Sequence, residues 1–181
     1  GRGVGRVVTT LLGPVPGLRL RPALPSDLWL YYWWASDLQV RLNSFKSDPI
    51  TQEHHRRWFA ARLKSEDAMM RILEDGNGLP IGQIRFDRSD GSYKRAVIAF
   101  SLDRTVRGRG LAPQLLELGL VELGRVWGNE YEAYGQVRAD NEASCLSFLR
   151  AGFHEDLPQK PRVRCFVRIA QSVPRDYAHN I

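Results

Sequence analysis

Short runs of apolar residues, several alternating with polar ones, occupy the first half of the chain. Leu18–Arg21 alternates leucine with arginine, and Met69–Leu73 and Pro80–Phe86 flank a turn at Asp75–Gly78. Two such runs joined by a turn rich in glycine and asparagine are typical of a β-hairpin. Ala96–Leu102 is the most strand-like run of the sequence. These patterns predict antiparallel strands in the first half of the chain.

Apolar residues at helical spacing, each set preceded by a polar capping residue or a glycine-rich loop, predict four helices. The first is strongly aromatic, and the third is rich in leucine. Their expected positions are Leu28–Trp34 after a cap at Ser26 or Asp27, Thr51 to about Lys64, about Leu111 to Arg125, and Asp140–Asn141 to Gly152.

The order of these elements predicts a mixed α/β sheet. The strand at Ala96–Leu102, the helix after it and a strand at Glu132–Arg138 form one strand–helix–strand crossover, which makes its two strands parallel. A short helix and a last strand at Arg162–Ile169 close the domain. We therefore expect antiparallel N-terminal strands plus one parallel β-α-β unit, in a domain over residues 18–170. Residues 1–17 are expected to be a linker or tail, and residues 171–181 a C-terminal tail.

Composition and charge narrow the classes of function. The chain has 181 residues, a hydrophobic fraction of 43% and a net charge of +6, which is typical of a soluble globular domain with an anionic partner. No apolar run reaches the roughly 18 residues of a membrane span, so we expect a cytoplasmic protein without a membrane partner. The basic residues are dispersed and no nucleic-acid-binding motif is present, which disfavours a nucleic-acid-binding module. Cys145 and Cys165 lie in apolar contexts and are expected to be structural, and no metal site is expected.

A glycine-rich loop carries the candidate chemistry. Arg107-Gly108-Arg109-Gly110 follows a predicted strand and opens a helix, a geometry in which backbone N–H groups and the helix dipole converge on phosphate. A P-loop is excluded because Gly-Lys-Ser/Thr is absent, and a Rossmann fingerprint fails at Pro113, where its third glycine is required. An ordinary solvated turn is the alternative.

Two motifs give the chain a resemblance to the GNAT superfamily of N-acetyltransferases. Arg107–Ala112 matches its pyrophosphate motif Q/R-x-x-G-x-G/A, and Asn141–Phe153 resembles its second signature, N-x-x-S/A-x-x-x-F/Y-x-x-x-G-F. The likeness covers about residues 18–170, in the right order of secondary structure. It implies the GNAT acyl-CoA N-acyltransferase fold and acetyl transfer from acetyl-CoA to a primary amine by direct attack in a ternary complex.

The resemblance also implies roles for particular residues. The segment around Ser101 would hold the acetyl carbonyl with backbone N–H groups. Many relatives carry a glutamate base where Val97 stands here, so Asp87 is the candidate base, acting directly or through water. Many also carry a tyrosine acid where Phe148 stands. The residues implied to contact acetyl-CoA are Phe100, Leu102, Arg107, Gly108, Arg109, Gly110, Leu111, Ala112, Asn141, Ser144 and Phe148.

A closer resemblance, through Ser44–Thr51, His55, Trp58 and Pro80–Asp87, is to the aminosugar N-acetyltransferases of the pseudaminic acid pathway. It implies a nucleotide-linked aminosugar as acceptor, with Asn43 and His55 as substrate contacts. The first eight residues resemble the end of a nucleotide-sugar hydrolase, which implies a fused domain. The alternatives are a protein N-terminal or small metabolite amine as acceptor, and a catalytically degenerate domain that only binds coenzyme A.

Overall fold

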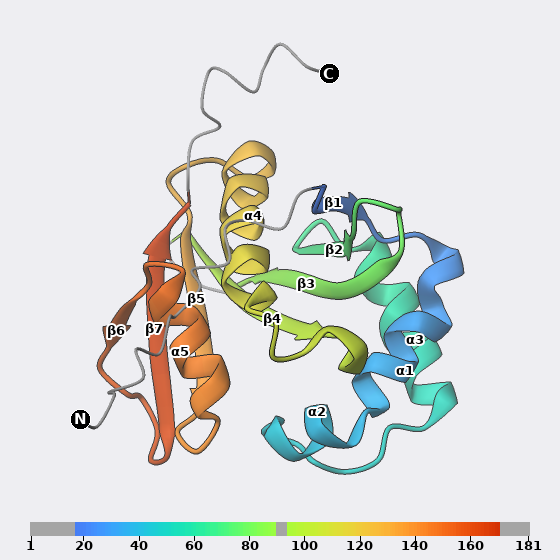
Figure 1. Ribbon diagram of the computed structural model, residues 1–181, viewed down its shortest axis with the longest axis horizontal. Coiled ribbons are helices and arrows are strands. Elements are labelled where there is room, and N and C mark those ends of the chain that lie inside the picture. The colour runs from blue at the N-terminus through green and yellow to red at the C-terminus, as the bar shows by residue number, and fades with distance from the viewer. Residues whose placement is uncertain (1–16, 90–93, 171–181) are drawn as a thin grey trace, which may run out of the picture.

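The computed structural model describes residues 17–89 and 94–170, which form one sheet with helices on both faces (Figure 1). The described strands lie in the order β1-β2-β3-β4-β5-β7-β6. The strands are β1 (Arg19–Pro22), β2 (Ala68–Glu74), β3 (Pro80–Arg88), β4 (Arg95–Leu102), β5 (Glu132–Arg138), β6 (His154–Asp156) and β7 (Val163–Ile169). The helices are α1 (Leu28–Ser36), α2 (Leu38–Asn43), α3 (Gln52–Lys64), α4 (Leu111–Val126) and α5 (Glu142–Arg150).

The sheet has the predicted mixed topology. Among the described strands, β4 and β5 are the parallel pair, and every other pairing is antiparallel. Helix α4 makes the crossover between them, as the strand–helix–strand order predicts. The mixed α/β fold class and its single parallel unit are therefore confirmed.

Alternating side chains of the strands build a core on each face. Met69 and Leu73 of β2 join a cluster beneath α4 and α5, whereas Met70 and Ile72 of the same strand join a cluster beneath α1 and α3. Because successive side chains of a strand point to opposite faces of the sheet, β2 contributes to the cores beneath both helical layers. The aromatic α1 is held because Tyr31 and Trp34 are buried in the second cluster.

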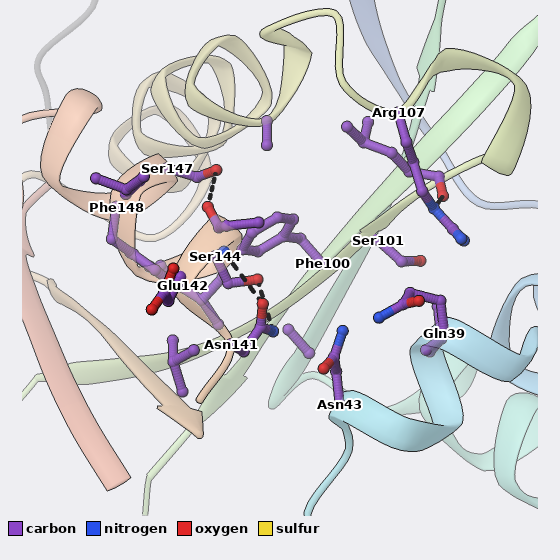
Figure 2. A pocket seen from close by; sticks show the side chains of 18 of the residues that line it. Gln39, Asn43, Phe100, Ser101, Arg107, Asn141, Glu142, Ser144, Ser147 and Phe148 are labelled. Carbon is purple, nitrogen blue, oxygen red and sulfur yellow. Dashed lines mark hydrogen bonds between the residues drawn. The ribbon is translucent and has the colours of Figure 1, made fainter. Parts of the chain in front are cut away.

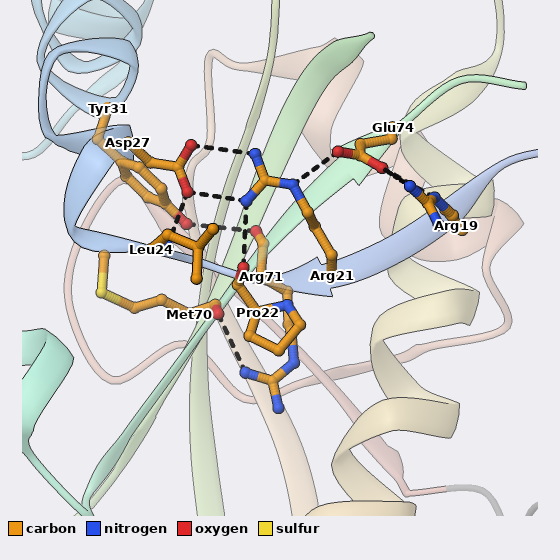
Figure 3. A network of polar contacts seen from close by, with 9 residues as sticks. All are labelled: Arg19, Arg21, Pro22, Leu24, Asp27, Tyr31, Met70, Arg71 and Glu74. Carbon is orange, nitrogen blue, oxygen red and sulfur yellow. Dashed lines mark hydrogen bonds and ion pairs between the residues drawn. The ribbon is translucent and has the colours of Figure 1, made fainter. Parts of the chain in front are cut away.

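An ionic network connects strand β1 to Asp27, just before α1, and to Glu74 of strand β2 (Figure 3). Arg21 contacts Asp27 at 2.8 Å and Glu74 at 2.6 Å, and both carboxylates are buried. Hydrogen bonds from Arg21 lower the pKa of Glu74. Burial alone would raise the pKa of Asp27, but hydrogen bonds from Arg21 and from the Leu24 N–H hold it below its ordinary value. Arg21 therefore stabilises both buried carboxylates as charges, and Arg19 also pairs with Glu74, at 2.6 Å.

Two elements differ from the sequence-based expectation. Helix α2 has six residues and leaves Leu38 and Leu42 exposed, so no apolar face marks it in the sequence. Its N-cap is Asp37, which accepts a hydrogen bond from the Val40 N–H at 3.2 Å. Strand β6 has three exposed residues and is specified by pairing with β7. The expected tails lie outside the described residues, except Gly17.

The described helices can be compared with a membrane-spanning helix in length and apolar character. None of them combines the length and the apolar character needed to cross a bilayer. Cys145 and Cys165 are both buried free thiols, in line with the structural role predicted for them.

Candidate active site

A cavity of about 1050 Å³ opens where β4 and β5 separate. Their pairing runs from Arg95 and Glu132 only as far as Ile98 and Gly135, although both strands continue. The loop before α4, the start of α5 and helix α2 complete its walls. Figure 2 shows Asn43 of α2 and Asn141 at the start of α5 facing each other across this cavity, which we call the groove.

The end of β4 presents backbone groups to the groove. The Asp103 N–H donates to the Ile81 carbonyl of β3 at 2.9 Å. Because successive residues of a strand direct their N–H groups to opposite edges, the N–H groups of Phe100 and Leu102 face the groove. No strand of the described chain pairs with them there. This edge can therefore donate hydrogen bonds to a carbonyl placed in the groove.

The loop before α4 has the geometry of a phosphate cradle. Gly108 and Gly110 have φ angles of +75° and +73°, and a Cβ atom on either residue would meet no atom within 4 Å. Gly110 is the N-cap of the 16-residue α4. Free N–H groups at the start of a long helix, beside backbone that no side chain covers, bind phosphate. Together with Leu111 and Ala112, which also line the groove, this cradle fits the pyrophosphate of coenzyme A.

The two arginines of the loop have different surroundings. Arg107 pairs with Asp37 at 2.9 Å, and its Nε donates to the Leu102 carbonyl at 3.1 Å. Its guanidinium therefore connects the loop to α2, rather than being free for phosphate. Arg109 is exposed and has no ion pair among the residues that the structure describes. Arg109 is thus the loop cation available to an incoming anion.

The start of α5 supplies polar groups to the groove. Asn141 caps the helix, because its Oδ1 accepts from the Ser144 N–H at 3.3 Å while its Nδ2 donates to Ser144 Oγ at 3.0 Å. Both residues line the groove. Phe148 also reaches it, but only 2% of this residue is exposed, and its ring stacks on Phe166 and lies against Gly135.

Ser101 of β4 lies between the groove and a second cavity of about 240 Å³. This second cavity lies on the face of the sheet that carries α1 and α3, and we call it the inner cavity. Ser101 is almost fully buried, and its Oγ accepts a hydrogen bond from Gln83 Nε2 at 3.1 Å. The inner cavity is lined by Tyr31, Trp34, Ala35, Val40, Arg41, Ser44, Trp58, Gln83, Arg85, Ala99, Phe100 and Ser101.

Three of the predicted site residues, Asp87, His55 and Arg109 of the loop before α4, line neither cavity. Asp87 sits at the far end of β3, where its carboxylate binds Arg62 at 3.1 Å and Arg85 at 2.7 Å. His55 is buried under α1, with its Nε2 2.9 Å from the Leu28 carbonyl. Burial lowers the pKa of His55 more than this hydrogen bond raises it. The Asp87 and His55 side chains therefore have structural partners where a catalytic or substrate contact was expected.

Sequence reasoning missed the polar residues of the inner cavity. Gln83 and Arg85 alternate with buried Ile84 and Phe86 on β3, and this alternation could have placed them on one face beside Ser101. Arg41 gave no such signal, because α2 was not predicted. Among the described residues, no group of three or more His, Cys, Asp or Glu could hold a metal ion.

Comparisons with known proteins bear on the whole domain. Residues 17–154 match the family model described as acetyltransferase (GNAT) domain. A search of curated proteins finds no significant match. Solved structures with the same fold include a spermidine N-acetyltransferase from Vibrio cholerae in complex with CoA and spermine, at 15% identity and a TM-score of 0.74, covering 85% of this chain and 96% of that one. They also include RimL, a ribosomal L7/L12 alpha-N-protein acetyltransferase in complex with coenzyme A, at 22% identity and a TM-score of 0.72, covering 86% and 96%.

Proposed function

The chain belongs to the GNAT family of acetyl-CoA-dependent N-acetyltransferases, and we propose that its acceptor is the primary amine of a nucleotide-linked aminosugar. The observation that carries this proposal is the position of Ser101 between two cavities. The groove has the size and the loop for acetyl-CoA, and the inner cavity has room for the reacting part of an acceptor. Two ligands that meet at one strand suit direct attack within a ternary complex.

The groove residues would hold acetyl-CoA while its thioester reacts. The N–H groups of Phe100 and Leu102 would bind the acetyl carbonyl and stabilise the negative charge that develops on its oxygen. The loop N–H groups around Gly110 would hold the pyrophosphate, and Asn141 and Ser144 the pantetheine arm. In the reaction the acceptor nitrogen bonds to the acetyl carbon and loses a proton to water, the carbon–sulfur bond breaks, and coenzyme A leaves as its thiolate, which takes a proton from solvent.

Proton transfer has few protein candidates here. Of the described residues that line the inner cavity, none is a carboxylate or a histidine. The amine must be neutral to attack, so we propose that water removes its proton. Phe148 has no proton to give to the departing sulfur, but a thiol of pKa about 8.5 leaves readily near neutral pH.

Three observations support an aminosugar acceptor. Tyr31, Trp34 and Trp58 line the inner cavity, and aromatic faces suit a sugar ring. Arg41 and Arg85 line it as well, and the net charge of +6 suits the phosphates of a nucleotide. Asn43, which lines the groove at the end of α2, lies where it could contact the part of the acceptor that extends from the inner cavity.

A turnover screen with acetyl-CoA tests the proposal. It should compare nucleotide-linked aminosugars, polyamines, amino acids and peptide N-termini by release of the coenzyme A thiol. The expected result is the highest kcat/KM for a nucleotide-linked aminosugar, with intersecting double-reciprocal plots from the ternary complex. Efficient acetylation of peptides with no turnover of any nucleotide-linked aminosugar would show that the acceptor is wrong.

A further inference from the structure

The inner cavity carries positive charge that is not fully balanced. Arg41 and Arg85 are its charged lining residues, and no carboxylate is among them. The guanidinium of Arg41 donates to neutral acceptors, namely the carbonyls of Lys46 and Asp48 and the hydroxyl of Ser44. Burial lowers the pKa of Arg41, as expected for a cation without an acidic partner.

Arg85 is the cation of the two that contacts a carboxylate. Its Nε donates to Asp87 at 2.7 Å, and its guanidinium lies over the Trp58 ring at 4.9 Å. Asp87 also pairs with Arg62, so one carboxylate is shared by two guanidinium groups. The terminal nitrogens of Arg85 have no hydrogen-bond partner in the described part of the chain. They remain able to bind a second carboxylate or a phosphate.

Two buried polar atoms of the inner cavity have no partner. Gln83 Oε1 and Arg41 Nε are both inaccessible to solvent and unpaired among the described residues. An unsatisfied buried polar atom is unfavourable, by about 1–3 kcal/mol, and is often explained by a ligand that supplies the missing group. Here the missing groups are a donor for Gln83 Oε1 and an acceptor for Arg41 Nε.

The position of Gln83 suits an amine at the point of reaction. Gln83 is the cross-strand neighbour of Ser101 and donates to its hydroxyl. This bond holds Nε2, and Oε1, which is inaccessible to solvent, accepts from a ligand once the Gln83 side chain turns toward the cavity. A donor bound to Oε1 lies next to Ser101, on the strand whose other edge faces the groove.

We propose that the inner cavity selects a primary amine that carries an acidic group, with Gln83 Oε1 accepting an amine N–H and Arg85 and Arg41 binding the acid. This assignment rests on the proposed acetyl transfer and names the chemistry of its acceptor. At about 240 Å³, the cavity is smaller than the roughly 300–1,000 Å³ typical of drug-sized ligands. The acid therefore lies no farther from the amine than the length of one sugar ring, and any larger remainder extends outside. A polyamine would place further positive charge beside two arginines, which is unfavourable.

Matched pairs of small acceptors test this selection. Glucosamine 6-phosphate with glucosamine, and β-alanine with its neutral amide, differ within each pair in one acidic group, and spermidine is the cationic comparison. We expect the acidic member of at least one pair to have a kcat/KM about tenfold or more above its neutral partner, the gain of one charge-assisted hydrogen bond. The two pairs distinguish a phosphate from a carboxylate as the recognised acid.

Arg85→Gln tests the residue, and Arg62→Gln is its control. Both variants remove a cation bound to Asp87, but Arg62 lies outside the inner cavity. Arg85→Gln should abolish the acid preference by raising the KM of the acidic member to that of its neutral partner, whereas Arg62→Gln should keep the preference. Gln83→Leu should lower kcat/KM for both members of a pair equally, and acetyl-CoA affinity measured by calorimetry should not change in any of these variants.

The outcomes separate this inference from acetyl transfer itself. Acetylation of acidic, neutral and cationic amines at similar kcat/KM would overturn the inference and leave the transferase assignment intact. So would a preference that survives in Arg85→Gln. If no probe is acetylated, binding decides: in the presence of coenzyme A, glucosamine 6-phosphate should raise the melting temperature more than glucosamine does, and an equal or absent shift would overturn the inference.

Discussion

Replacing Gly110 by valine should separate acetyl-CoA binding from folding. Gly110 has a φ angle of +73° and faces open space in the groove. A valine there would be strained, because left-handed backbone is unfavourable for a β-branched residue. It would also place two methyl groups where we expect the pyrophosphate to meet the N–H groups of α4.

Gly78 provides a control with the same backbone strain. It has a φ angle of +78° in the turn between β2 and β3, again with no atom near the position of a Cβ, and it lines neither cavity. Either substitution should lower the free energy of unfolding by about 1–3 kcal/mol. For a domain of this size that is roughly 2–12 °C in melting temperature.

The two variants should differ in their response to acetyl-CoA. At a ligand concentration 100 times Kd, binding adds about 2.7 kcal/mol to stability, which is roughly 5–11 °C. Wild type and Gly78→Val should both show this rise in thermal unfolding, and Gly110→Val should not. Calorimetry measures the affinity directly. An unchanged Kd in folded Gly110→Val would refute the phosphate-cradle assignment.

Three further changes have distinct expected outcomes. Arg107→Ala should weaken acetyl-CoA binding less than Gly110→Val in calorimetry, because Arg107 is held by Asp37. Phe148→Tyr should lower unfolding free energy in urea by about 1–3 kcal/mol, since its hydroxyl would be buried against β5 without a partner, and should change turnover by less than about tenfold. Arg21→Met should lower unfolding free energy by about 3–5 kcal/mol at pH 7, because it removes the cation that pairs with buried Asp27 and leaves Glu74 with Arg19 alone. Because pairing lowers the pKa of both acids, that stabilisation is lost as pH falls, and the difference should shrink below about pH 4.

The fold was predictable where local sequence and burial agree. The helix capped by Thr51 was expected to end at about Lys64, and α3 ends there, because a polar cap and a spaced apolar face both specify it. Strand β5 has the predicted ends at Glu132 and Arg138 for a similar reason. Helix α2 has neither a buried face nor a strong propensity signal. Its position depends on the bond between Asp37 and Arg107, a contact between residues distant in sequence.

The sequence predicted the geometry of the loop before α4, but not that of the inner cavity. Glycine at positions 108 and 110 indicates a left-handed backbone, and the order of strand, loop and helix puts both residues at the start of α4. Asp87 and His55 were selected by chemical type, which does not reveal that Arg62 or the Leu28 carbonyl is already their partner. The inner cavity is formed by tertiary packing of α1, α2 and α3 on the sheet, so no contiguous motif reports it.

The structure also links the two cavities through two contacts between their walls. Trp34 of α1 donates from its Nε1 to Asp103 at 2.9 Å, and Asp37 at the start of α2 pairs with Arg107. The two partners on the loop side, Asp103 as acceptor and Arg107 as donor, lie in the segment just before Gly110, whereas Trp34 also lines the inner cavity. A displacement of the loop would therefore also move α1 and α2, which line the inner cavity. Since a hydrogen bond and an ion pair each restrict the side chains that make them, the loop before α4 and the inner cavity are held in register by the contacts of Trp34 with Asp103 and of Asp37 with Arg107.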